Sequence, residues 1–389
     1  MRVLVRYEMK KFFRKWKNLA LIFGFFLLIL LYADNRRNLD EAINKFKVDM
    51  HQTSIDSSKQ GLNQIIFDYE EAKKSNNTTL MEKIKPIIEV QESRYNIYLE
   101  MKKHLINNNW REVLRLEIKM DQEDWDAIEQ GFYSSDESDL TILGRIEKNT
   151  YLLENEIEPI NEDANVSSLN FIRIFFKGMF PLAIILIFSL CTADMVSDEF
   201  DFGTGKLLFT QPISRGKIIW SKIITGNAIC LGMLLFGIGI ASLILGFLYG
   251  FGNPSYPITI VSATGNYFME IWKFDLLVLA LAVLLTISIV SISILCSVII
   301  GTSMGSIALV TVTYIGYYIM NYNFGFMRKS AMFIPYTYAN IVEVLNGTAA
   351  KTVSNSDLNF QLGVSVLAVS ILIANLLSVT LIKKKNIHN

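Results

Sequence analysis

The tetrapeptide GTGK at residues 203–206 is similar to the end of a loop that binds nucleotide phosphates. Such a loop needs the spacing Gly-x-x-x-x-Gly-Lys-Ser/Thr directly after a strand, so that backbone amides surround the phosphates. Leu207 stands where a magnesium-binding Ser or Thr is required, and Phe200 occupies the position of the first glycine. No strand is expected before this segment. We therefore interpret GTGK as a chance match, and we expect this chain not to be an enzyme.

The cysteines and histidines give no sign of a metal site. All three cysteines fall inside apolar runs, so neither a disulfide framework nor a thiolate metal site is expected. The three histidines are far apart in the sequence and show no HExxH-type spacing. We expect the chain itself to bind no metal and no cofactor.

The composition is typical of an integral membrane protein. Of 389 residues, 51% are hydrophobic, and they cluster in long runs. The formal net charge of zero hides a split, because residues 34–168 hold 17 Lys/Arg and 28 Asp/Glu, a net charge of −11. The remainder of the chain carries the balancing +11. This asymmetry indicates two environments, and we expect no nucleic-acid partner.

Six apolar segments approach the roughly 20 residues that a helix needs to cross a bilayer. They are Asn18–Ala33, about Phe171–Ala193, Ile223–Tyr249, Leu276–Ile300, about Ser306–Met320 and Leu362–Ile382. All must be helices, because lipid offers no hydrogen-bond partner to backbone amides. The sequence therefore predicts an all-α integral membrane protein with six transmembrane helices and a helical extracellular domain between the first two spans.

Basic residues flank both ends of this set of spans. Seven Lys/Arg precede the first span, and Lys383, Lys384 and Lys385 follow the last. By the positive-inside rule both termini are cytoplasmic, so residues 198–222 lie inside and residues 34–168 lie outside. Abundant Lys, Asn and Ile hint at a bacterial origin. A cleaved signal peptide over residues 1–33 is the alternative to an amphipathic entry helix that leads into a retained span.

The outer segments differ in their patterns. Residues 34–168 show apolar residues at three- and four-residue spacing, which predicts a small bundle of long antiparallel helices broken at 75–79, 107–109 and 131–139. Residues 252–275 are expected to be an outer loop. The semi-apolar stretch at 321–348 contains Gly325 and Pro335, and it could form a short re-entrant or interfacial helix.

The inner segment at about 198–222 predicts a compact helix–turn–helix. Thr204 can cap a short helix that Pro212 ends, and Ser214 can cap the next helix, which runs into the third span. Leu207, together with its two neighbours Leu208 and Phe209, forms an apolar knob. Either lipid headgroups or a protein partner could cover this knob.

This inner segment resembles that of ABC-2 type transporter permeases, as do the six spans and the basic entry helix over residues 1–33 and 169–389. In that family the segment is a coupling helix that sits in a groove of a separate ATP-binding subunit. The resemblance implies that eight residues form or brace this contact: Glu199, Gly203, Thr204, Leu207, Leu208, Pro212, Ser214 and Arg215. It also implies two ATP-binding subunits that bind ATP and magnesium, and a second membrane subunit, identical or homologous.

Two further groups of residues are candidates for a transport pathway. One helical face of the fifth span carries five polar residues, Thr311, Tyr314, Tyr317, Tyr318 and Asn321. This face could line a conduit, or its hydroxyl groups could bind a neighbouring helix. Arg173 and Lys177 at the outer start of the second span could anchor that helix at the interface or form an outer gate.

These observations favour the membrane subunit of an ATP-driven ABC exporter in the bacterial cytoplasmic membrane. Peptides or other amphipathic compounds are the expected substrates, and peptide immunity is a possible role. The alternative is a membrane sensor whose outer domain binds a ligand and signals without transport. A neighbouring gene for an ATPase would favour the exporter, whereas a neighbouring kinase gene would favour the sensor.

Overall fold

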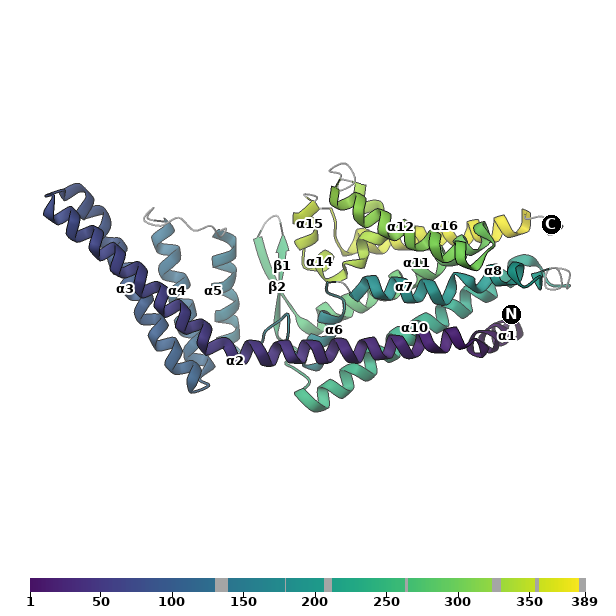
Figure 1. Cartoon of the computed structure of the whole chain (residues 1–389), viewed down its shortest axis with the longest axis horizontal. Coiled ribbons are helices and arrows are strands. Elements are labelled where there is room, and N and C mark those ends of the chain that lie inside the picture. Colours follow the sequence, from purple (N-terminus) through teal and green to yellow (C-terminus); the bar gives the residue numbers. More distant parts are fainter. Residues whose placement is uncertain are drawn as a thin grey trace. The chain divides into compact units, whose positions relative to one another are not determined.

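The computed structural model describes residues 1–129, 139–178, 180–205, 212–262, 265–323, 330–353 and 357–384. Within these residues the chain is nearly all helical and divides into two compact units (Figure 1). One unit comprises residues 1–35, 166–252 and 272–389, and the other comprises 36–165 and 253–271. We call them the membrane unit and the outer unit.

Six helices of the described chain are long and apolar enough to cross a membrane, as the sequence predicted. They are Trp16–Lys74, Pro181–Asp201, Arg215–Tyr249, Ile271–Ile300, Ser303–Met320 and Phe360–Lys384. The corresponding elements are α2 (Trp16–Lys74), α7 (Phe180–Thr192) with α8 (Asp194–Asp201), α10 (Arg215–Tyr249), α11 (Ile271–Ile300), α12 (Ser303–Asn323) and α16 (Phe360–Lys384).

The first two spans differ from the sequence prediction in their boundaries. A separate helix, α1 (Arg2–Arg14), precedes α2, and the chain is extended at Lys15 between them. Helix α2 continues far beyond Ala33 to Lys74, because no proline interrupts the residues that follow the apolar run, and the single glycine there, Gly61, is accommodated within the helix. The second span is divided, since a short helix α6 (Ser168–Phe175) ends before Gly178, which has a positive φ of 73°.

Close packing within the membrane unit depends on a glycine in α10. A Cβ atom at Gly237 would lie 2.7 Å from Cδ1 of Ile29 and 3.1 Å from Cε1 of Phe25, both on α2. The ring of Phe25 in turn lies 5.6 Å from that of Phe188 on α7. Gly237 therefore permits α2 and α10 to approach closely beside this aromatic pair.

The stretch before the last span consists of short helices. These are η1 (Ala331–Phe333), η2 (Pro335–Ala339), α14 (Ile341–Leu345) and α15 (Thr348–Val353). Pro335 begins η2 and Tyr338 is buried against Gly363 of α16. This part of the chain is thus broken, as Pro335 predicted, while residues 324–329, which include Gly325, lie outside the described residues.

The outer unit contains α3 (Thr78–Ile106), α4 (Trp110–Glu129) and α5 (Asp139–Glu154) beside the later part of α2. The turns before α3 and α4 fall at the polar breaks that the sequence indicated, and Asn76 and Asn108 adopt positive φ there. A core forms between α3 and α4 around Ile97, Met101 and Val113. The third expected break, 131–139, lies outside the described residues except for Asp139, where α5 begins.

The expected outer loop at 252–275 is instead partly a β-hairpin. Strand β1 (Pro257–Ser262) pairs antiparallel with β2 (Gly265–Glu270), with Pro257 opposite Glu270. The run Ile-Thr-Ile-Val at 258–261 is rich in β-branched residues, which is the signal that the loop prediction overlooked. The hairpin packs on α5 in the outer unit, where Asn266 contacts Gly144.

Candidate functional site

Helix α8 leads into the inner segment, and residues of other helices form hydrogen bonds with both of its ends. Its first turn has no cap of its own, but the hydroxyl of Ser297 on α11 accepts from the backbone N–H groups of Val196 and Ser197, at 3.2 and 2.9 Å. At the other end, Gly203 has a positive φ of 68°. Gly203, the first glycine of the GTGK match, therefore ends the helix. A glycine is favoured there because it adopts the left-handed conformation without strain.

Glu199 of α8 lies at the centre of a buried ion cluster. Its Oε1 atom accepts from Lys222 Nζ of α10 at 2.9 Å and from Lys11 Nζ of α1 at 2.5 Å, while its Oε2 atom accepts from the Thr204 hydroxyl at 2.6 Å. Lys222 is completely buried and also pairs with Glu8 of α1, at 3.0 Å. This cluster joins α1, α8 and α10 through charged groups whose separation would be costly.

A second part of the cluster surrounds the joint between α1 and α2. Asp194 accepts from Lys17 at 2.5 Å and from Lys15 at 3.3 Å, and Lys15 also pairs with Asp198. Burial by itself lowers the pKa of Lys15, but the carboxylates of Asp194 and Asp198 outweigh this effect, so that the pKa of Lys15 is raised above its ordinary value. Lys15 therefore remains positively charged at the point where the chain turns from α1 into α2.

Helix α8 also holds the start of α12. The Ser303 Oγ atom lies 2.7 Å from a carboxylate oxygen of Asp198 and 2.7 Å from one of Asp201, so its single proton can be donated to either carboxylate. The Ser303 backbone N–H donates to Asp201 at 2.8 Å. A carboxylate in this position satisfies an amide at a helix N-terminus and favours the helix dipole. Helix α8 is thus bonded to α1, α2, α10, α11 and α12, and we call these contacts the α8 hub.

The far side of the inner segment is tied to the last span. Arg215, the first residue of α10, donates to the backbone carbonyls of Ile382 and Lys383 at the end of α16, each at 3.4 Å. Ser214 occupies the N-cap position of α10 with an extended backbone, but its side chain makes no capping hydrogen bond. Pro212 is exposed, and Leu207 and Leu208 lie outside the described residues.

The structure places the tyrosines of α12 in two environments. Tyr314 is buried with its ring 5.4 Å from that of Tyr336, and the Tyr317 hydroxyl lies 2.7 Å from that of Thr337, so η2 covers both. Tyr318 is 61% exposed. Thr311 donates to a carbonyl of its own helix, and the side chain of Asn321 is not among those described. The contacts of Tyr314 and Tyr317 suit helix packing, and a pathway along this face stays a prediction.

The two cations at the outer start of the second span also differ. Arg173 is buried at 4% exposure and its guanidinium donates to Asn170, with Nη2 at 2.9 Å from the amide oxygen. Lys177 is half-buried. Their roles as interface anchors or as an outer gate stay predictions.

Residues 2–382 match the family described as ABC-2 family transporter protein. The chain belongs to the ABC-2 transporter family. This permease is therefore a multi-pass membrane subunit of an ABC transporter, and permeases of the family generally work with an ATP-binding subunit. Neither the curated proteins nor the solved structures include a match to it.

The α8 hub of this ABC-2 permease contains residues that sequence reasoning did not single out. Asp194, Asp198 and Ser303 were missed because their partners lie about 100 residues or more away in the chain. One signal was available in the sequence. Acidic residues at 194, 198, 199 and 201 directly follow an apolar run, and basic residues precede the first span, so charge pairing at one membrane face could have been inferred.

Proposed function

We propose that this permease is the membrane subunit of an ATP-driven exporter, and that residues 198–222 form the coupling element that contacts a separate ATP-binding subunit. Two copies of the ATP-binding subunit bind ATP and magnesium, and a second membrane subunit, identical or homologous, completes the transporter. Closure of the ATP-binding subunits moves the coupling element. The spans then shift between inward-facing and outward-facing states.

The α8 hub is the observation that carries this proposal. A segment that transmits force must be bonded to the helices that it moves, and its flanks are bonded to α1, α10 and α12 through Glu199 and Asp201. Arg215 bonds the other flank to α16. Residues 206–211, between these flanks, contain the apolar knob for the partner groove.

The orientation and substrate class follow from charge. Excess Lys/Arg beside the first and last spans supports cytoplasmic termini in a bacterial membrane, so the α8 hub faces the cytoplasm and the ATP-binding subunit. Residues 34–168, with a net charge of −11, lie outside. An acidic outer domain attracts cationic molecules, which supports export of amphipathic cationic peptides or protection against them.

Co-purification tests the proposal. The affinity-tagged chain, extracted in mild detergent from its native cells, is expected to carry an ATPase with it. The variant Leu207→Asp places a charge on the apolar knob and is expected to abolish the association. Arg215→Glu is expected to weaken it, because the α10 flank loses its bond to α16.

The matched control is Phe202→Asp, which places a charge on an exposed side chain of the same segment. It is expected to retain more of the ATPase than Leu207→Asp does. Recovery of the intact chain without any ATPase would contradict the exporter and favour a sensor that signals without transport.

A further inference from the structure

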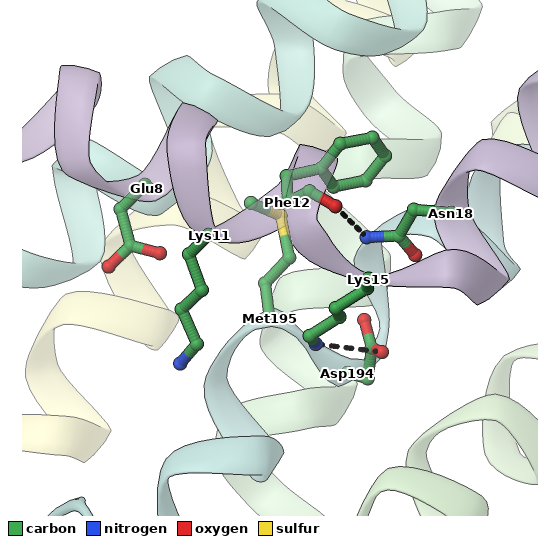
Figure 2. Close-up of a pocket in the computed structure, with 7 residues that line it drawn as sticks. All are labelled: Glu8, Lys11, Phe12, Lys15, Asn18, Asp194 and Met195. Atoms are coloured by element: carbon green, nitrogen blue, oxygen red, sulfur yellow. Dashed lines mark hydrogen bonds and ion pairs between the residues drawn. The ribbon is translucent and has the colours of Figure 1, made fainter.

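A small pocket lies at the joint between α1 and α2, against the start of α8. Phe12 and Lys15 line it from α1 and the joint, Asn18 from α2, and Asp194 and Met195 from α8 (Figure 2). All these residues belong to the membrane unit. The pocket has room for about one water molecule.

Two buried oxygen atoms of the pocket residues have no hydrogen-bond partner. Asn18 is 1% exposed; its amide nitrogen donates to the Phe12 carbonyl at 3.0 Å, which fixes the amide orientation and leaves Oδ1 unbonded. Asp194 is 5% exposed, and its Oδ2 atom binds lysines whereas Oδ1 is unbonded. Figure 2 shows both side chains beside Lys15. A buried acceptor without a donor has lost its bonds to water and gained none in return, so two in one pocket call for a ligand that donates to both.

The chemistry of the pocket selects that ligand. Both free atoms are acceptors, which disfavours an anion and requires a donor. A metal cation would meet the ammonium groups of Lys11 and Lys15, which also line the pocket. The carboxylates already have lysine partners: Glu8 and Glu199 pair with Lys222, and Asp194 and Asp198 pair with Lys15. A neutral molecule with two O–H donors fits these demands.

We propose that this pocket is a binding site for one structural water, which donates to Asn18 Oδ1 and to Asp194 Oδ1. Its oxygen accepts from a lysine ammonium of the pocket. The water supplies hydrogen bonds that no side chain of the joint supplies, and it can re-form them when α1 tilts relative to α2. The site does not depend on the transported substrate or on the ATP-binding subunit.

Hydroxyl-radical footprinting of the detergent-solubilised full chain tests this site, because radicals generated from a bound water oxidise the side chain beside it. Met195 lines the pocket but is only 7% exposed. Met101 and Met233 are also buried, at 1% and 5% exposure, and neither lines this pocket. Met195 is expected to oxidise several-fold faster than both.

Variants of the chain and a change of buffer cation identify the ligand in the same experiment. Asn18→Leu removes one acceptor and is expected to slow Met195 oxidation to the rate of Met101, whereas Asn227→Leu on α10 is expected to leave it unchanged. Exchange of sodium for choline in the buffer is expected to have no effect. Equal oxidation rates for Met195, Met101 and Met233 in the unaltered chain would overturn the site, and a rate that follows the sodium concentration would replace the water by a cation.

Discussion

At the residue scale, Lys222 is the clearest case of a charge that the fold must satisfy. Its ammonium is completely buried and bonds to two carboxylates from different helices, Glu8 and Glu199. Two lysines, Lys217 and Lys222, follow the Pro-Ile-Ser-Arg stretch at 212–215 in the sequence. Only the structure shows which of the two is buried, because Lys217 is exposed on the same helix. Side-chain burial near a membrane face depends on which helices meet there, and local sequence does not contain that information.

Lys222→Met is therefore expected to destabilise the chain by about 3–5 kcal/mol, the cost of leaving buried partners without their counter-charge. Lys217→Met on the exposed side of α10 is expected to change stability by less than about 0.5 kcal/mol. Thermal unfolding of both variants in the same detergent, followed by intrinsic fluorescence, compares them. Equal melting temperatures for the two variants would contradict the importance of the cluster.

A second residue-scale prediction concerns Glu117 on α4 of the outer unit. Burial raises the pKa of Glu117 above its ordinary value of 4.5, and the neighbouring Asp121 adds to this effect, although Lys47 and a bond from Asn149 oppose it. The folded chain thus holds this proton more tightly than the unfolded chain. The stability that this bound proton contributes is fully present below the ordinary pKa of a glutamate, and it is lost as the pH rises through the raised pKa of Glu117.

Glu117→Gln keeps the shape and removes the titration, so at neutral pH α4 is expected to be more stable than in the unaltered chain. Below the ordinary pKa this advantage is expected to disappear. Hydrogen–deuterium exchange of α4 peptides, measured for both proteins at each pH, reports the difference. Glu129→Gln, at an exposed position on the same helix, sets the baseline. If the greater stability of α4 in Glu117→Gln did not change with pH, the raised pKa of Glu117 would be contradicted.

At the element scale, sequence periodicity predicted where the helices lie but not where each of them begins and ends. The apolar runs predicted the six candidate spans, because hydropathy is a local property. The sequence also predicted a first span that starts at Asn18, close to Trp16, where α2 begins. It did not indicate that one helix extends to Lys74, nor that Asn77 caps α3, by accepting from Leu80 N–H at 3.1 Å. Helix ends depend on single hydrogen bonds, and several neighbouring polar residues could have made each of them.

The contact between α2 and α10 gives an element-scale prediction. Gly237→Leu would drive a side chain into Ile29 and Phe25, and it is expected to destabilise the membrane unit by about 1–3 kcal/mol. Gly239→Leu, two residues further on, points into open space and is expected to be tolerated. The amount of each variant that elutes as a single species from size-exclusion chromatography after mild heating tests the difference. Similar losses for both would contradict the close approach.

At the scale of the whole molecule, the family resemblance named the fold class and the ATP-binding partner, and the family match supports both. The α8 hub could not be foreseen in the same way. Most of its described bonds join residues separated by 100 positions or more, such as Asp201 and Ser303, although Glu199 and Lys222 are 23 positions apart, and one sequence carries no record of which distant residues meet. The motif residues Glu199 and Gly203 were identified, but their physical roles, as the centre of an ion cluster and as a helix end, required the structure.

The proposed orientation can be tested by thiol labelling. The native cysteines are all buried, so they contribute little background. Cysteine at Lys74 (Lys74→Cys) is expected to react with a membrane-impermeant maleimide on intact cells. Cysteine at Lys384 (Lys384→Cys) is expected to react only after the cells are permeabilised. Both positions are exposed in the structure. The opposite pattern would place the termini outside and remove the α8 hub from the cytoplasm.

Both ends of α8 depend on hydrogen bonds with residues of later helices, and this has a consequence for biosynthesis. Eight residues are too few to hold a helix by themselves in water. The hydroxyl that closes the first turn of α8 belongs to Ser297, and the amide that its last carboxylate binds belongs to Ser303. The ribosome makes both about 100 residues after α8. A nascent chain that stops before these serines thus lacks the partners that satisfy both ends of α8.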